Sequence, residues 1–256
     1  MTTPANGGGI AGSVLLYRRP EPLNPDTHAH LGLKRSPNPY RYAATTHAVP
    51  LHVTEFGPAA INYPIIFAGE ERQPMAIMSI RQNENLFISP DGFFEPDAYV
   101  PAFLRRYPFV LADDPQNGRL IVCIDREAEA LVPGGDVPLF SAGQPTDFTT
   151  GAIEFCTNFE TERQRTESFV KLCKELDLFE LKEATFTPTN EDGSPAAPIR
   201  LADYFAISED KIKALPADKL VELRDSGALG QMYAQLLSLF NWDKLVARTL
   251  TRQPQA

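Results

Sequence analysis

The chain has 256 residues, of which 43% are hydrophobic and 22% are charged. This composition is ordinary for a globular protein, so it excludes disorder, collagen and coiled coil as descriptions of the whole chain. The 33 acidic side chains outnumber the 24 basic ones and give a formal net charge of -9. That balance disfavours a broad nucleic-acid-binding surface, and no nucleic-acid partner is expected.

Residues 1–46 are rich in glycine, proline, asparagine and threonine, which predicts an extended or disordered N-terminal arm. The arm lacks the basic and apolar regions of a Sec signal peptide. We therefore expect a cytoplasmic location by default, and a surface or envelope location would need another export route. His28 and His30 are predicted to lie exposed in this proline-rich segment.

From residue 47, short apolar runs alternate with turn signals such as Asp91-Gly92 and Asn117-Gly118. This alternation is typical of antiparallel strands and hairpins. A short helix is predicted within residues 99–107, where Pro101 suits the first turn. The runs predicted as strands are residues 64–68, 75–80, 86–88, 108–112 and 120–124.

After residue 145 the apolar period changes from two to 3.6, which predicts a long helix over residues 152–176 and shorter helices after residue 208. Residues 226–242 carry no formal charge, but their polar content and length favour a buried amphipathic helix over a transmembrane segment. The stripe predicted to pack on the strand-rich part consists of Leu229, Met232, Tyr233, Leu236, Leu237, Phe240 and Leu245, and it leaves Gln231, Gln235, Ser238 and Lys244 elsewhere.

These patterns predict an α+β fold with a mainly antiparallel, strand-rich N-terminal half and a helical C-terminal half packed against it. We expect a single domain over residues 47–250, strand-rich over 47–145 and helical over 146–250. The three cysteines form no Cys-x-x-Cys pair, and all four histidines precede residue 53. The cysteines are therefore expected to be small buried hydrophobic residues, with no metal site and no cofactor.

The densest unusual cluster is residues 99–109, in which Arg105, Arg106 and Tyr107 lie among aromatic side chains. Guanidinium groups bind carboxylates or phosphates bidentately and also stack on rings. Alternatively, the two arginines cap the short helix and pair with internal acids such as Asp125 while the aromatic rings fill the core.

Three further residues complete the candidate ligand-binding set. Glu84 and Asn85 could present a polar binding edge, or the segment from Asn83 could form a turn whose side chains satisfy backbone groups. Asp125 ends a predicted strand, where it could act as an acid or base or serve as a salt-bridge partner or cap. No catalytic residue is identified.

At these segments the sequence resembles the bacterial SapC family. The resemblance covers roughly residues 47–248 and implies a surface-associated or envelope-associated assembly role, since the family's name comes from a protein of a bacterial surface layer. SapC-like proteins are often labelled peptide-transporter permeases, but this sequence lacks the spanning helices that a permease requires. The motifs that carry the resemblance are Tyr63–Phe67, Glu84–Phe87, Asp91-Gly92, Tyr99–Phe109, Cys123–Asp125, Pro138–Phe140 and, near the C-terminal end, Trp242.

Two functions follow from these features. The first is a non-catalytic binding or assembly protein whose unknown protein partner belongs to the envelope or surface layer. The second is a soluble cytoplasmic accessory protein or enzyme that binds an anionic small molecule through Arg105 and Arg106, with Asp125 as acid or base. The absence of a recognisable catalytic motif favours the first function over an enzyme.

Overall fold

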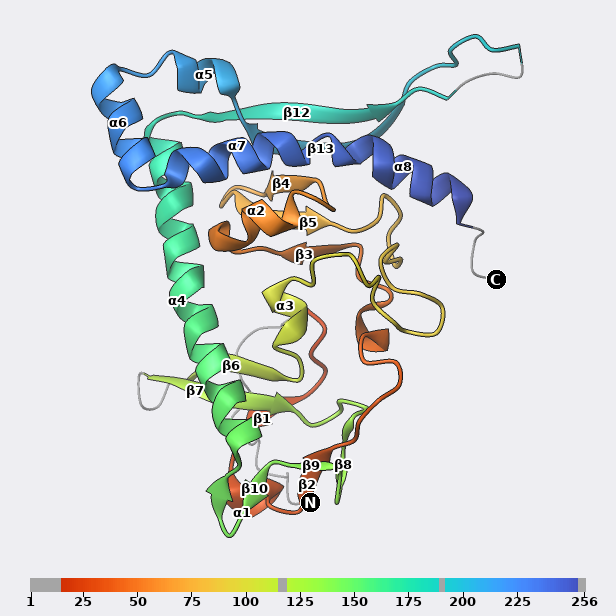
Figure 1. The fold of residues 1–256 in the computed structure, drawn as a ribbon, viewed down its shortest axis with the longest axis vertical. Coiled ribbons are helices and arrows are strands. Elements are labelled where there is room, and N and C mark those ends of the chain that lie inside the picture. The colour runs from red at the N-terminus through yellow and green to blue at the C-terminus, as the bar shows by residue number, and fades with distance from the viewer. Residues whose placement is uncertain (1–14, 115–118, 189–191, 253–256) are drawn as a thin grey trace, which may run out of the picture. The chain divides into compact units, whose positions relative to one another are not determined.

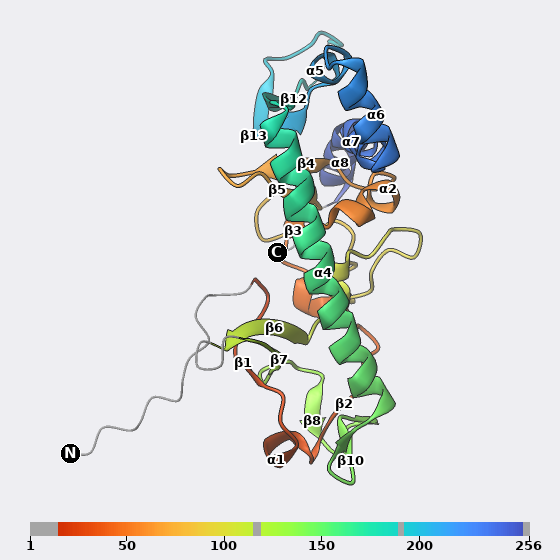
Figure 2. The same cartoon turned by 90° about the vertical axis from the view of Figure 1, so that its left-hand side faces the viewer.

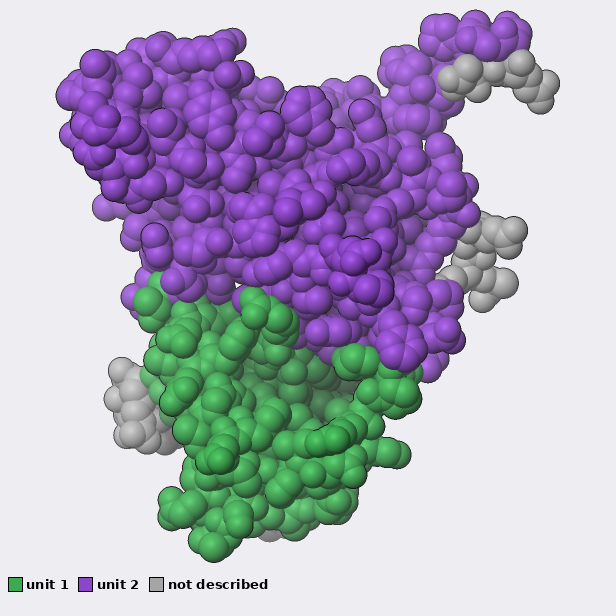
Figure 3. All heavy atoms as spheres, viewed as in Figure 1, with its two compact units in different colours: residues 1–39, 105–161 green, residues 40–104, 162–256 purple. Residues whose placement is uncertain are grey.

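The computed structural model describes residues 15–114, 119–188 and 192–252 of the chain. Contacts within the chain group it into two compact units, which Figure 3 shows in different colours. Unit 1 comprises residues 1–39 and 105–161, and unit 2 comprises residues 40–104 and 162–256. The predicted turn at Asn117-Gly118 and the first 14 residues of the predicted arm lie outside the described residues.

Unit 1 is built from short antiparallel strands (Figure 1). Its core includes Phe109, Ile124, Leu139 and Cys156, all buried. In one sheet β7 (Arg119–Asp125) lies between β1 (Pro20–Pro22) and β6 (Phe109–Asp114), and in a second β2 (Leu31–Leu33) lies between β8 (Leu131–Pro133) and β9 (Val137–Pro138). The ribbon of β10 (Phe140–Ser141) and β11 (Gln144–Pro145) leads into α4 (Asp147–Glu175), whose residues after 161 belong to unit 2.

The described part of the predicted arm is folded into unit 1 up to residue 39. After Asn24, whose side chain accepts a hydrogen bond from the Asp26 backbone N–H, the chain forms α1 (Pro25–His28). Leu31 is buried in the core, and β2 approaches its neighbours so closely that a Cβ on Gly32 would lie 2.7 Å from the carbonyl oxygen of Gly135. This segment therefore differs from the extended arm expected from its composition, because capping and strand pairing order it.

Unit 2 is organised around one five-stranded antiparallel sheet. Its order is β12 (Phe179–Phe186), β13 (Ile199–Ile207), β4 (Ile65–Ala68), β5 (Gln73–Ile77) and β3 (Ala48–Pro50). Figures 1 and 2 show α7 (Ala228–Ser238) and α8 (Asn241–Thr251) packed along this sheet. Besides the C-terminal part of α4, the other helices with residues in this unit are η1 (Arg41–Ala43), η2 (Val53–Glu55), α2 (Phe56–Ala59), α3 (Ala102–Arg105), α5 (Glu209–Lys213) and α6 (Ala217–Asp225).

The core of unit 2 is aromatic. The Phe56 ring packs edge-to-face against Phe67 and Phe169, with ring centres 6.1 and 5.9 Å apart. Because Phe169 lies on α4, these contacts attach the end of that helix to the sheet. Edge-to-face geometry is the arrangement that the ring quadrupole favours.

The antiparallel sheets and the helical C-terminal part confirm the α+β fold class. The strand predicted at residues 86–88 is wrong, because only an isolated bridge from Ile88 to Phe94 forms there. Side chains of Asn85 and Ser89 bond nearby backbone N–H groups and turn the chain. Residues 188–198 were expected to form a loop or hairpin turn, but the strands β12 and β13 that flank them were not predicted and lie within the half expected to be helical. The single domain over residues 47–250 stays a prediction.

The predicted stripe of the last helix is partly wrong. The predicted helix is interrupted between α7 and α8, and the side chains of Leu237 and Phe240 are 61% and 74% exposed. The buried face instead carries Met232 together with the polar residues Gln235 and Ser238. These polar side chains bond backbone groups of the sheet, which a purely apolar face would leave unsatisfied.

Candidate functional site

Arg105 and Arg106 face aromatic rings of unit 1. The guanidinium carbon of Arg106 lies 4.1 Å from the centre of the Phe159 ring and 5.6 Å from that of Tyr17. The guanidinium carbon of Arg105 lies 5.4 Å from the Phe155 ring. Rings attract cations placed over their faces. These two arginines therefore hold the start of β6 against α4, which carries both phenylalanines.

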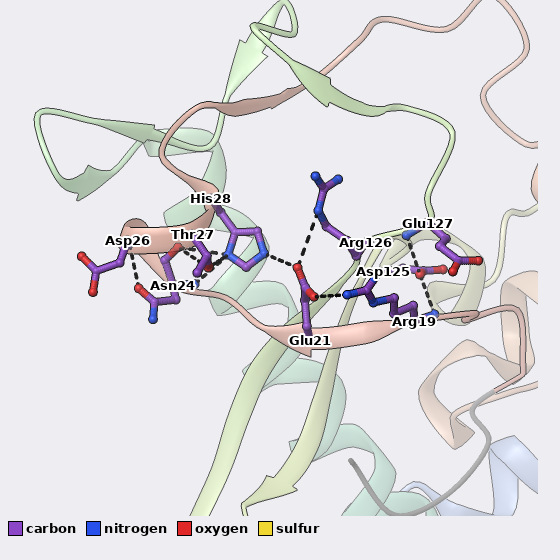
Figure 4. A network of polar contacts seen from close by, with 9 residues as sticks. All are labelled: Arg19, Glu21, Asn24, Asp26, Thr27, His28, Asp125, Arg126 and Glu127. Carbon is purple, nitrogen blue, oxygen red and sulfur yellow. Dashed lines mark hydrogen bonds and ion pairs between the residues drawn. The ribbon is translucent and has the colours of Figure 1, made fainter. Parts of the chain in front are cut away.

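Asp125 is fully buried at the end of β7, where its carboxylate binds backbone groups (Figure 4). Its Oδ1 accepts the N–H groups of Arg19 at 2.9 Å and Glu127 at 3.1 Å, and its Oδ2 accepts that of Arg18 at 3.1 Å. The Tyr107 hydroxyl lies 3.4 Å from Oδ2. Burial and the nearby carboxylate of Asp125 raise the pKa of Tyr107 above its ordinary value. In these contacts Asp125 caps the turn after β7 and joins it to the N-terminal segment.

His28 is buried rather than exposed, so the prediction for this residue is wrong. Its Nδ1 lies 3.1 Å from the backbone nitrogen of Asn24 and 3.0 Å from the carbonyl oxygen of that residue, and its Nε2 lies 2.9 Å from Glu21 Oε1. Glu21 also lies 3.7 Å from Arg126 and 3.8 Å from Arg19 (Figure 4). The Asn24-Pro25 pair, an N-cap followed by a first-turn proline, is the sequence signal that could have predicted α1 and the inward ring.

Glu84 and Asn85 belong to unit 2 and lie in the loop after β5, whereas the other four predicted site residues belong to unit 1. Glu84 is half-buried, and it accepts a hydrogen bond from Ser79 at 2.7 Å and lies 4.0 Å from Arg81. Asn85 is 1% exposed, and its Oδ1 accepts the Phe87 N–H at 3.0 Å. Asn85 therefore shapes the loop, and Glu84 faces a cavity beside it.

This cavity has a volume of about 310 Å³ and is lined by Glu84, Asn85 and three arginines, Arg41, Arg81 and Arg252. Three positive charges against one carboxylate leave a formal charge of +2 in a chain whose net charge is -9. Sequence reasoning found Glu84 and Asn85 but missed the arginines, which lie far apart in sequence. We call this space the arginine cavity.

Arg252, just after α8, is held in the cavity wall by the loop itself. Its Nη1 donates to the carbonyl of Asn85 and its Nη2 to that of Ile88, both at 2.7 Å. Among the described residues, neither Arg252 nor Arg41 forms an ion pair with a carboxylate. A guanidinium group has five N–H donors, so these two bonds fix its position and leave donors for an anion.

The described cysteines and histidines offer no nucleophile or metal site. Burial raises the pKa of Cys123 and Cys156 to about 11 and that of Cys173 to about 12, so all three thiols stay protonated at neutral pH. This confirms the cysteines as buried hydrophobic residues. No group of three or more His, Cys, Asp or Glu side chains that could hold a metal ion occurs in the described ranges.

The SapC family model matches residues 23–245. The chain belongs to the SapC family. No curated protein and no solved structure matches it. The match begins 24 residues before the resemblance expected from the motifs, so it adds α1, β2 and Arg41 to the segment that already held Arg81. Arg252 follows the matched segment.

The described residues of this SapC-family chain include no helix suited to spanning a membrane. Across the described ranges, no helix combines the length and apolar character needed to cross a bilayer, including the 29-residue α4.

Proposed function

We propose that this SapC-family chain is a non-catalytic binding protein that takes an anionic ligand in the arginine cavity of unit 2. One observation carries the proposal: Arg41, Arg81 and Arg252 line a cavity of about 310 Å³, and Glu84 is the one acidic residue among its described lining residues. This volume lies at the lower end of the roughly 300–1,000 Å³ typical of ligand pockets.

The charge of the lining selects the ligand class. Guanidinium groups bind carboxylate and phosphate oxygens through two parallel hydrogen bonds, and a concave wall of one charge sign raises the local concentration of the opposite ion. Glu84 is held by Ser79 and lies beside Arg81, which lowers its effective repulsion of an anion. The described lining of the cavity holds no cysteine or histidine, and its one hydroxyl group, that of Ser89, accepts the N–H of Phe93, so binding rather than turnover is proposed.

Isothermal titration with inorganic phosphate tests this function. We expect Arg41→Gln and Arg81→Gln each to weaken phosphate binding about tenfold or more, because hydrogen bonds between charged groups are the strongest class. Arg224→Gln is the matched control, since Arg224 is an exposed arginine on α6 of the same unit. Equal affinities in the wild type and both cavity variants would contradict the proposal.

Binding of an anionic small molecule by Arg105 and Arg106 remains a separate prediction. Their cations lie over rings of α4 and Tyr17, so anion binding there would compete with the cation–π contacts. The double variant Arg105→Gln/Arg106→Gln tests it in the same titration. Loss of phosphate binding in this variant alone would move the ligand site to unit 1.

We also propose an assembly role at the envelope, which the exposed apolar side chains of α7 and its C-terminal end favour. Tyr233, Leu237 and Phe240 follow helical spacing and are 37%, 61% and 74% exposed. Exposed apolar patches mark protein interfaces, and the family name implies a surface-layer context. The double variant Leu237→Ser/Phe240→Ser should abolish crosslinks to envelope partners, while Leu181→Ser on β12 should not. Recovery of the unmodified protein wholly in the cytosol, without such crosslinks, would sink this role.

A further inference from the structure

A second hollow adjoins the arginine cavity in unit 2. It measures about 710 Å³ and is lined mainly by apolar side chains of residues 86–96, among them Phe87, Ile88, Phe93 and Phe94. Ile88, Ser89, Pro90 and Arg252 line both spaces, so the two are neighbours across one stretch of loop and one arginine. We call the second space the apolar groove.

Two of the charged side chains of the apolar groove, Glu95 and Arg248, pair with each other. Both oxygens of Glu95 bond the guanidinium group of Arg248, whose carbon also lies 4.5 Å from the centre of the Phe87 ring. Phe93, in contrast, is 50% exposed at the rim. The groove thus offers apolar surface and no unpaired carboxylate among its described lining residues, while the adjoining cavity carries the excess positive charge.

The shared wall is fixed by the backbone. Arg252 donates to the carbonyls of Asn85 and Ile88, and Ile88 forms a bridge with Phe94. The turn between them is closed by the N–H of Gly92, which donates to the Ser89 carbonyl at 2.8 Å, with Gly92 at a φ of +86°. A φ of this sign favours glycine. These bonds preorganise an anion-binding arginine next to an apolar floor.

We infer that the ligand is a monomeric anionic amphiphile, with its carboxylate or phosphate head in the arginine cavity and its alkyl chain in the apolar groove. This inference rests on the proposed anion site and names its ligand class. Charge complementarity selects the head, and the adjacency of the two hollows, which share Arg252 as a lining residue, selects a chain attached to it. A small inorganic anion would leave the groove unused.

Titration calorimetry with four probes separates the parts of the inference. Octanoate and octyl phosphate carry both head and chain, acetate and inorganic phosphate carry the head alone, and all are used below their micelle concentrations. Burying two methylenes tightens binding roughly tenfold. We therefore expect each amphiphile to bind at least about tenfold tighter than its matching head group.

Two variants locate the chain and the head. Phe93→Ser should weaken octanoate binding severalfold and leave phosphate binding unchanged, whereas Arg41→Gln should weaken both. The matched control is Leu181→Ser, because Leu181 is 67% exposed on β12, outside the groove. Phe93 is half exposed and its backbone bonds do not need the ring, so the fold should persist, as circular dichroism would verify.

Equal affinities for octanoate and acetate would overturn the amphiphile and leave the anion site standing. Absence of phosphate binding in the wild type would overturn the anion site itself. Binding to phosphatidylglycerol vesicles without binding of monomeric octanoate would also overturn the inference, because the ligand would then be a membrane surface.

Discussion

The carboxamide of Gln235 donates a hydrogen bond to the carbonyl oxygen of Ile65, over 2.9 Å, in the core of unit 2. Its Oε1 accepts the backbone N–H of Ile207 at 3.1 Å. Phe205 pairs with Phe67 in the antiparallel ladder of β13 and β4, so Ile207 and Ile65 lie opposite each other two positions further along. The Gln235 side chain thus stands in for a missing pair of backbone bonds where the two strands separate.

Replacing Gln235 with leucine should destabilise the protein by about 2–5 kcal/mol, because it leaves one backbone donor and one acceptor buried without partners. Urea unfolding measures this change. The matched control is Gln231→Leu on the same helix, since the buried Oε1 of Gln231 has no hydrogen-bond partner among the described residues. Equal losses in the two variants would show that the bridge contributes nothing specific.

Truncating a side chain on the buried face of α7 should destabilise the protein far more than truncating one on its exposed face. Met232 is fully buried, so Met232→Ala should cost about 2–5 kcal/mol of unfolding free energy. Leu237 is 61% exposed, and Leu237→Ala should change it by less than about 0.5 kcal/mol. Thermal and urea denaturation compare them. A large loss for Leu237→Ala would mean that this side chain is buried in the folded protein.

Asp125→Asn should destabilise the protein by about 2–4 kcal/mol. The carboxylate accepts three backbone N–H groups, and an amide offers one oxygen and an NH₂ group that cannot accept them. Glu129→Gln, an exposed change on the same turn, is the control. An unchanged unfolding free energy in Asp125→Asn would contradict the capping role of this carboxylate.

Alkaline pH should weaken the fold through its buried thiols. In the unfolded chain a thiol ionises near 9.0, whereas burial raises the pKa of Cys123 to about 11 and of Cys173 to about 12. Above pH 9 the unfolded state releases these protons first, so the unfolding free energy falls as pH rises from about 9 toward 11–12. It is unaffected by the thiols below that range.

Urea unfolding at pH 8, 9 and 10 checks this dependence. Cys173→Ala should reduce the decline between pH 9 and 10, which precedes ionisation of unfolded-chain tyrosines near 10.0. The thiols should also resist Ellman's reagent at pH 8 until the protein unfolds. Rapid modification of a thiol in the folded protein would contradict the burial of the cysteines.

Regular apolar patterns made part of the fold predictable. The runs that became β4, β6 and β7, and the 3.6-residue period of α4, were recognised because burial on one face leaves a period in the sequence. The burial of Gln235 and Ser238 was missed, since their partners are backbone groups of distant strands. The inward turn of His28 was missed for a different reason, because the local N-cap at Asn24 and the first-turn proline Pro25 were not used to predict α1.

The candidate site was predictable only in part. Glu84 and Asn85 stood out as a polar run between apolar segments, and the structure places them in the wall of the arginine cavity. Arg41, Arg81 and Arg252 had no common signal, because only the packing of α8 on the loop brings residues so distant in sequence together. Arg105 and Arg106 attracted attention by adjacency, and rings occupy their faces.

Amide chemical-shift mapping during a phosphate titration tests the anion site most directly, because it distinguishes the two arginine clusters in one experiment. We expect the largest shifts at Arg81, Glu84 and Arg252 in unit 2, saturating with a single dissociation constant and lost in Arg41→Gln. Saturable shifts confined to Arg105 and Arg106, or no saturable shifts at all, would contradict the account.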